Sequence, residues 1–507
     1  MQAPFWFLLG ALVVTSCSAP AAQPVATCPP CPVCVTPAPV ASANASAGVA
    51  PAKPASDKPA VASDPTVEKL QARALGDSHA YDLVRSLVDE VGPRMSGSPG
   101  DKAAVAWGLR TMKELGLTNV RAEKVMVPHW ERGAERGRIV SPVVQTLTLT
   151  ALGGSVPTPG NKGIEADVVM VDSLDALAKL DETRVKGKIV FFSTQMARSH
   201  TGQDYARVGP IRAEGAMAAA KKGAVAMVLR SVGTDHDRFP HTGAFKHEKS
   251  VPEIPAAALS IPDADMLERL VSSGKPVRIS VTLESKTFPD AESANVVGEI
   301  LGREKPDEIV LMGAHLDSWD AGVGALDDGA GCGAILDASR LILGLPERPR
   351  RTIRVVLFAN EENGLRGAKQ YAVDHAAEVA KHQLAFELDL GSGRVHTTRF
   401  LRGDDSQSAY TRMAELLVPL GIAFEAAPAF GGADTIPLRA LGVPIADLHQ
   451  DASTYFDIHH TANDTLAQVS KTDLAQVVAA ATTVAWFAAE TPDTFDRVPE
   501  GRRERKR

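Results

Sequence analysis

Four short segments in the second half of the chain are apolar on both faces, and they limit the fold more than any other feature. They read EIVLMGAH, TIRVVLFAN, QLAFELD and VPIADLH, and segments with helical spacing lie between them, at 329–343, 365–379 and 407–419. A strand that is apolar on both faces must be covered on both sides, as in a parallel sheet with helical crossovers. The chain is therefore predicted to be an α/β protein with a mostly parallel mixed sheet sandwiched by helices.

The chain is long enough for more than one folded part, since 507 residues exceed the size of an average domain. Residues 66–139 show the helix, loop, helix and strand patterns with which an α/β domain begins, and residues 289–492 continue the α/β alternation. Between them, residues 140–288 show short strands and one strong helix, so we predict an inserted β-rich domain. Residues 493–507 are interpreted as a basic tail, and its end, GRRERKR, is expected to be solvated and frayed.

The first residues have the pattern of an export signal. An apolar run, short for a membrane span, is followed by Val14, Thr15, Ser16 and Cys17, which resembles the end of a bacterial lipoprotein signal. We interpret residues 1–17 as this signal, with lipid on Cys17 holding an exported protein in the cell envelope. The next residue, a serine, resembles sorting signals for the outer membrane. A plainly secreted form and an uncleaved anchor are the alternatives.

Residues 18–65 are dominated by Ala, Pro, Val and Ser, and they contain too few large apolar groups to form a core. We predict a disordered tether. Within it Cys28, Cys31 and Cys34 are spaced three apart, but the tether offers no fourth zinc ligand, which favours oxidised or partner-linked thiols. Cys332 is expected to pack as a small apolar residue in a helix. A net charge of −7 argues against a nucleic-acid partner.

Acids and imidazoles gather where the predicted strands end, and working groups of such sheets collect there. The set is His315, Asp317, Asp327, Asp328, Glu361, Glu362, Asp389, His459, His460 and Asp464. So many carboxylates on one edge would repel one another without cations between them. Mixed imidazole and carboxylate ligands favour zinc, with cobalt and manganese as alternatives. The glycines around Asp327 would let the backbone bring a bridging carboxylate close to two metal ions.

Taken in order, the motifs resemble those of one peptidase family. AHLDSWDAGVGALDDGAG, ANEENGLRG, ELD and HHTANDT are similar to motifs of the di-zinc aminopeptidase and glutamate carboxypeptidase family, and GPRMSGSPG is similar to its carboxypeptidase Q branch. The likeness covers about residues 66–490, and residues 140–288 resemble the protease-associated domain inserted in many members. The resemblance implies the zinc exopeptidase fold and two zinc ions per chain.

The resemblance also implies roles for the proposed zinc ligands and for the base. The terminal zinc ligands would be His315, Glu362, Asp389 and His460. Asp327 would bridge the two ions, and its peptide bond to Asp328 is often cis in this family. Glu361 would be the general base. Three carboxylates are expected to orient ligands instead of binding metal: Asp317, Asp328 and Asp464.

Some of these residues have readings without a metal. His315 could be a buried core histidine, although Asp317, two residues further on, could orient its second nitrogen and so favours a ligand. Glu361 and Glu362 could be a solvated pair at the start of a helix, where negative charge is favourable. Between His459 and its neighbour His460, the spacing of HTANDT points to His460. The motifs together favour the metal site.

The predicted reaction is hydrolysis of a peptide bond near a free terminus, in dipeptides or short peptides. A hydroxide shared by two zinc ions would attack the carbonyl, while Glu361 takes its proton and passes it to the leaving amine. The alternatives are a broader aminopeptidase, a mono-zinc acyltransferase like the glutaminyl cyclases, and a non-catalytic binding protein on the same scaffold. The expected partners are a short peptide and a membrane reached through the lipid anchor, and a homodimer is left open.

Overall fold

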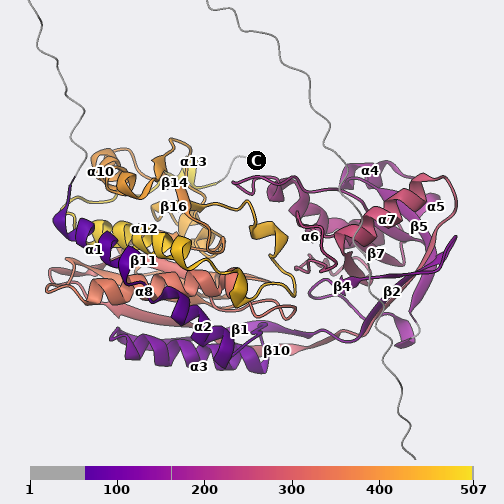
Figure 1. Cartoon of the computed structure of the whole chain (residues 1–507), viewed down its shortest axis with the longest axis horizontal. Coiled ribbons are helices and arrows are strands. Elements are labelled where there is room, and N and C mark those ends of the chain that lie inside the picture. The colour runs from indigo at the N-terminus through magenta and orange to yellow at the C-terminus, as the bar shows by residue number, and fades with distance from the viewer. Residues whose placement is uncertain (1–62, 162, 505–507) are drawn as a thin grey trace, which may run out of the picture. The chain divides into compact units, whose positions relative to one another are not determined.

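The structure, a computed structural model, describes residues 63–161 and 163–504, which contain two eight-stranded sheets with helices packed on them (Figure 1). The predicted signal at 1–17, with Cys17, lies outside the described residues, as do Cys28, Cys31 and Cys34 in the predicted tether. The end of that tether is ordered, because Pro65 begins the first helix and the Asp64 side chain accepts hydrogen bonds from the first turn.

The first sheet has the strand order β1-β10-β12-β11-β13-β16-β14-β15. Its strands are β1 (Thr118–Glu131), β10 (Lys286–Ile300), β11 (Lys305–His315), β12 (Arg351–Phe358), β13 (His382–Glu387), β14 (Val395–Leu401), β15 (Ala423–Phe424) and β16 (Ile445–Gln450). The central strands β12, β11, β13 and β16 are parallel, whereas β10 and β14 pair antiparallel on either side of them. The predicted α/β fold with a mixed sheet is confirmed.

Helices cover both faces of this sheet. Val310 and Met312 of β11 pack into one core, and Leu311 between them packs into another, as the period of two in a strand requires. The first core is covered by α1 (Pro65–Gly76), α2 (Ala80–Glu90), α3 (Pro99–Glu114), α8 (Ala330–Leu343), α10 (Gln407–Leu417) and α12 (Lys471–Glu490). The second is covered by α9 (Arg366–Asp374) and α11 (Ile436–Ala440). Cys332 is buried in α8, as expected.

Helix α12 lies deep in the first core. Its N-cap residue Ser470 accepts a hydrogen bond from the backbone N–H of Asp473, as N-cap serines do. Among the helices of the described ranges, it is the one long and apolar enough to cross a membrane, but 89% of its apolar window is buried inside the protein. The burial identifies α12 as a core helix of this fold.

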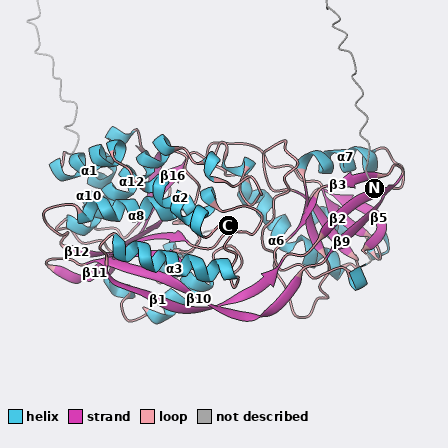
Figure 2. Ribbon diagram, turned by 60° about the horizontal axis from the view of Figure 1, so that its bottom comes forward, coloured by secondary structure: helices cyan, strands magenta, loops and turns pink. Residues whose placement is uncertain are grey.

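The second sheet, with the order β3-β2-β9-β5-β6-β7-β8-β4, comes from the predicted insertion. Its elements are β2 (Glu135–Ser141), β3 (Gln145–Leu147), β4 (Leu149–Ala151), β5 (Ile164–Val171), α4 (Leu174–Lys179), α5 (Glu182–Val185), β6 (Ile189–Phe192), α6 (Tyr205–Lys221), β7 (Ala226–Arg230), β8 (Ala256–Leu259), α7 (Ile261–Ser272) and β9 (Arg278–Leu283). We call residues 135–283 the inserted segment. The long antiparallel strands β1 and β10 lead into it and out of it (Figure 2). Its assignment to the protease-associated domain stays a prediction.

The C-terminal residues differ from the prediction. Phe495 and Val498 are 4% and 0% exposed, Arg497 donates to three backbone carbonyls, and the short helix α13 (Glu500–Arg503) follows. Residues 495–498 of the predicted basic tail therefore pack against the fold, whereas Gly501, Arg502 and Glu504 at its end are exposed. The net charge of the segment gave no indication that two of its apolar side chains pack into the cores on the first sheet.

Candidate metal centre

The predicted site residues meet at the carboxyl ends of neighbouring parallel strands. His315 is the last residue of β11, and β11 pairs in parallel with both β12 and β13. Glu361 and Glu362 follow β12, and Asp389 follows β13. Two further segments complete the site: the turn η2 (Ala325–Gly329), which carries Asp327, and the loop after β16, which carries His459 and His460.

Asp327 lies at the centre of this cluster. Its Oδ1 atom is 3.0 Å from Nε2 of His315, and its Oδ2 atom is 3.3 Å from Nε2 of His460. On the first side, His315 Nε2 is also 3.4 Å from Oδ1 of Asp389. On the second side, His460 Nε2 is 3.0 Å from Oε2 of Glu362. Two groups of donor atoms thus share one carboxylate, the arrangement that a metal-bridging aspartate needs.

The donor atoms fit divalent cations better than they fit one another. Asp327 and Glu362 are 4% and 8% exposed, yet Glu362 Oε1 has no hydrogen-bond partner among the described residues, and Asp327 Oδ2 accepts no well-directed bond. Buried polar atoms are nearly always paired, so these oxygens point to a missing electrophile. Imidazole nitrogens mixed with carboxylate oxygens suit zinc. His459, whose Nε2 is 3.6 Å from Asp327 Oδ2, also lies within reach of a metal.

The electrostatics of the cluster show an excess of negative charge. Burial and the charge of Asp327 raise the pKa of Glu362 to about 7. Burial opposes the charging of His460, but Glu362 and Asp327 raise its pKa to about 9. Burial likewise opposes the charging of His315, and Asp389 and Asp327 raise its pKa well above the usual range. Divalent cations would neutralise this excess and return the carboxyl groups to their ionised state.

The three carboxylates predicted to orient ligands bind backbone N–H groups. Asp464 accepts from Leu326 and Asp327, at 2.7 and 3.1 Å, and so holds the turn η2. Asp328 accepts from His315 and Gly331, at 3.1 and 3.0 Å, and its peptide bond to Asp327 is cis. The two carboxylates therefore differ in their partners: that of Asp327 faces the metal cluster, and that of Asp328 accepts from the backbone.

Asp317 differs from its expected role. The Nδ1 atom of His315 is 3.0 Å from the backbone carbonyl of Asp317, whereas the nearest carboxylate oxygen of Asp317 is 3.9 Å away. The carboxylate accepts instead from Ser96 Oγ and from the backbone N–H of Glu361, both at 2.9 Å. Asp317 thus orients the metal-facing side of His315 through its main chain and positions Glu361 through its side chain.

Arg94, in the motif GPRMSGSPG, is a supporting residue whose role the sequence did not reveal. It is fully buried, and its guanidinium donates to the carbonyls of Leu316, Val323 and Gly324 at 2.5, 2.6 and 2.8 Å. These carbonyls belong to the loop between β11 and η2. A planar group with several fixed donors suits this task, because it can satisfy three carbonyls at once.

The inserted segment holds the loop that carries His459 and His460. The backbone N–H of Thr242 donates to the His460 carbonyl at 3.0 Å, and the Thr242 carbonyl lies 3.2 Å from His460 Nδ1. His241 is buried, and its Nδ1 atom is 2.7 Å from the carbonyl of His459. Arg198 forms a bidentate ion pair with Asp457 of the same loop. The orientation of two candidate ligands therefore depends on residues far away in sequence.

The connection into the inserted segment and the inserted segment itself both pack on the loop after β11. Arg132, just before β2, donates to both carboxylate oxygens of Asp320 at 2.9 and 2.8 Å. A side chain at Gly153 would come within 2.0 Å of the Trp319 ring, so only glycine permits this close approach. The ring of Trp319 lies 5.7 Å from that of His460.

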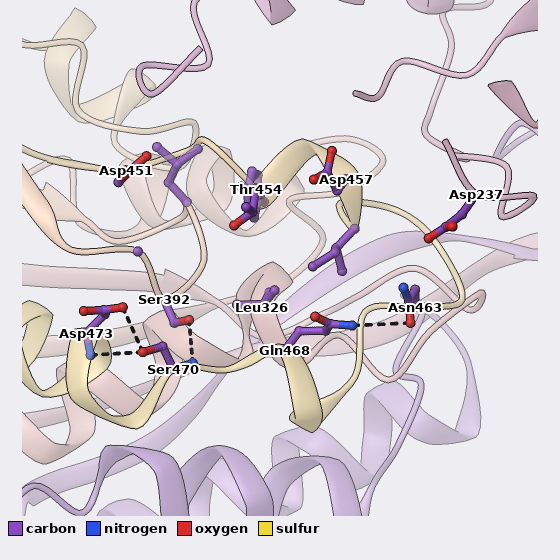
Figure 3. A pocket seen from close by; sticks show the side chains of 14 residues that line it. Asp237, Leu326, Ser392, Asp451, Thr454, Asp457, Asn463, Gln468, Ser470 and Asp473 are labelled. Atoms are coloured by element: carbon purple, nitrogen blue, oxygen red, sulfur yellow. Dashed lines mark hydrogen bonds between the residues drawn. The ribbon is translucent and has the colours of Figure 1, made fainter. Parts of the chain in front are cut away.

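A cavity of about 390 Å³ adjoins the metal-site loops (Figure 3). Leu326, Leu390 and Ile458 line it and are the sequence neighbours of Asp327, Asp389 and His459. The rest of the lining is polar and includes Asp237, Asp451, Asp457 and Asp473. In Figure 3, Asp451, Thr454 and Asp457 lie above Ser392 and Leu326. The cavity offers space for polar groups beside the cluster.

Proteins similar to this chain are known in sequence and in structure. Residues 295–485 match peptidase family M28. The chain is 36% identical to carboxypeptidase Q of Mus musculus over 420 residues, which are 83% of this chain and 87% of that one. Its fold is similar to the crystal structure of a peptidase M28 precursor from Shewanella amazonensis, with a TM-score of 0.84, 45% identity, and coverage of 85% and 98% of the two chains. A zinc aminopeptidase of Bacillus subtilis shares the fold at 22% identity and a TM-score of 0.61, over 83% of this chain and 98% of that one.

Proposed function

The chain belongs to peptidase family M28 and is a zinc-dependent exopeptidase; from this premise we propose that it holds two zinc ions and cleaves dipeptides or other short peptides. The observation that carries the proposal is the position of Asp327, whose two carboxylate oxygens face separate groups of buried ligand atoms. One ion would be held by His315, Asp327 and Asp389. The other would be held by Asp327, Glu362 and His460.

Zinc supplies Lewis-acid chemistry when bound, because it polarises a carbonyl and lowers the pKa of a water molecule toward about 7. The protein supplies the proton transfer. Glu361 lies beside the cluster with its backbone N–H fixed by Asp317, and burial together with Asp389 and Glu362 raises the pKa of its carboxyl group well above the usual range. A carboxyl group of raised pKa can take a proton from the attacking water and deliver it to the leaving amine.

The proposal is tested by metal content together with activity. Purified protein should contain about two zinc ions per chain, hydrolyse members of a dipeptide panel, lose activity on chelation and regain it with zinc. Glu361→Gln should keep zinc and fold but lower turnover about 10²–10⁴-fold, since only the proton carrier is removed. Near-normal turnover in a zinc-loaded Glu361→Gln protein would exclude Glu361 as the base. One zinc per chain with acyl transfer to an internal amine would instead support the cyclase-like alternative.

We further propose that the enzyme is exported and anchored by lipid on Cys17. The support is the sequence pattern alone, an apolar run ending at a cysteine and followed by an Ala- and Pro-rich segment. The outer membrane is the proposed location, with a plainly secreted enzyme as the alternative.

A further inference from the structure

Ser96, in the motif GPRMSGSPG between α2 and α3, is a buried residue to which the proposed function assigns no role. It is 1% exposed, and its hydroxyl donates to Oδ2 of Asp317 at 2.9 Å and accepts from Nδ2 of Asn360 at 3.0 Å. A hydroxyl group has one proton, and because Asn360 occupies its acceptor side, that proton is directed at Asp317. Ser96 therefore joins the segments that follow β11 and β12.

Asp317 has two donors within reach of one oxygen. Its Oδ1 atom accepts the backbone N–H of Glu361 at 2.9 Å and lies 3.9 Å from Nδ1 of His315. The bond from Ser96 fixes the other oxygen, so the carboxylate stays turned toward Glu361. Asp317 is 1% exposed, and without Ser96 its Oδ2 atom would have no donor among the described residues. The carboxylate would then gain by turning toward His315, because a buried charged oxygen without a donor is costly.

Asn360 directs the chain into the turn that carries Glu361. Its φ is +61°, in the left-handed region that asparagine adopts more readily than most side chains do. Its amide donates one N–H to the side chain of Asn363, and its Oδ1 atom accepts from the backbone N–H of Arg366 at 3.4 Å. The second N–H of the amide donates to Ser96, so the serine holds this turn as well.

Glu361 depends on this support, because no residue of the described ranges forms a hydrogen bond with its carboxyl group. The position of the carboxyl group is therefore set by the main chain of Glu361. Asp317 holds the N–H of that main chain, and Asn360 sets its direction. Displacing a reacting group by about 1 Å can lower a rate about 100-fold, so small movements of this main chain would be seen in turnover.

We propose that Ser96 is a positioning residue for the general base: it holds Asp317 and Asn360, and through them the main chain of Glu361. This inference rests on the proposed function, because it concerns the base of the same site. It predicts that loss of the Ser96 hydroxyl lowers turnover and leaves zinc binding intact.

The kinetic test compares Ser96→Ala with Ser98→Ala in the full-length, zinc-loaded enzyme. Ser98 belongs to the same motif, but its side chain caps α3 by accepting from the N–H of Asp101. Ser96→Ala should lower kcat for a dipeptide about 10–100-fold, with KM within about threefold of wild type and with the zinc content of wild type. Ser98→Ala should lower the melting temperature without changing kcat, because it removes only a helix cap.

Asn360→Gly removes the other partner of Ser96. Glycine accepts the positive φ without strain but offers no amide to the serine hydroxyl. This variant should lower kcat about 10-fold, again with unchanged zinc content. Wild-type kcat in both Ser96→Ala and Asn360→Gly would overturn the inference.

A double-mutant cycle connects the effect to the base. In the Glu361→Gln background no proton carrier remains to be positioned, so Ser96→Ala should cause no further loss of turnover. The same factor of loss in both backgrounds would show that Ser96 acts independently of Glu361 and would refute the positioning role. Near-normal turnover of Glu361→Gln itself would instead refute the proposed base, so the two failures are distinguishable.

Hydrogen exchange gives a readout that needs no substrate. The amide of Glu361 donates to Asp317, so it should exchange slowly in the zinc-loaded wild type and at least about 10-fold faster in Ser96→Ala. In Ser98→Ala it should exchange at the wild-type rate. Equal exchange of this amide in wild type and Ser96→Ala, or equal acceleration in both serine variants, would contradict the proposal.

Discussion

Asp327→Asn should damage the metal centre, whereas the same change in its neighbour Asp328 should not. Asp327 faces His315 on one side and His460 on the other, at 3.0 and 3.3 Å. An amide there removes one negative charge and offers one acceptor oxygen where two are used. If a zinc site is worth about 10–16 kcal/mol and has about four ligands, each ligand accounts for about 3–4 kcal/mol, which corresponds to roughly 10²–10³-fold in affinity.

Asp328→Asn should act on stability instead. Its carboxylate accepts from the N–H groups of His315 and Gly331, and an amide can accept only one of these bonds. Loss of one hydrogen bond to a charged group costs about 1.5–3 kcal/mol. The assay is zinc content after dialysis, with urea unfolding of both metal-free variants. Two retained zinc ions and full activity in Asp327→Asn, with metal loss only in Asp328→Asn, would refute the assignment of the bridge.

Three further changes probe the rest of the chain. Burial lowers the pKa of His382 from 6.5 to about 4. Between these pH values the unfolded chain binds more protons than the folded chain, so the free energy of unfolding should fall by on the order of 3 kcal/mol as the pH drops through this window. His382→Gln should flatten that slope in urea unfolding of the metal-free protein, and an unchanged slope would contradict the assignment. Arg132→Ala should cost about 3–5 kcal/mol, because it leaves Asp320 without its bidentate partner, and an unaltered melting curve would contradict this expectation. Cys17→Ala should move the protein from the membrane to the soluble fraction of lysed cells, and unchanged partitioning would argue against lipidation.

The sequence predicted several residues of the cluster because they lie at or just after the ends of readable strands. His315 ends β11 and Asp389 follows β13. The apolar faces of these strands identify them without a structure, and parallel strands bring their carboxyl ends to one edge. Glu387, two residues before Asp389, is not indicated by the sequence, because a single glutamate in an apolar strand forms no pattern. Its carboxylate accepts a hydrogen bond from the backbone N–H of Asp434, which lies in a loop more than forty residues away in sequence.

The residues that hold the site loops in place also cannot be identified from the sequence. The motif around Arg94 was recognised, but nothing in it shows that the guanidinium binds three carbonyls of a loop more than two hundred residues further on. Thr242 and His241 belong to the inserted segment, whose strands indicate only that it folds, yet they hold the main chain of His459 and His460. Such contacts produce no periodic pattern in the sequence, because a single donor and a single acceptor form each of them.

The sequence by itself determined the α/β alternation, the inserted segment and the set of candidate zinc ligands, because apolar periodicity and the chemistry of strand ends are local properties. Only the tertiary structure decided which oxygens of Asp327 face which ligands, that the side chain of Asp317 serves Glu361 and not His315, and that Glu387 and Asp434 share one buried space. These outcomes depend on distances between segments remote in sequence, and such distances are set by packing of the whole core.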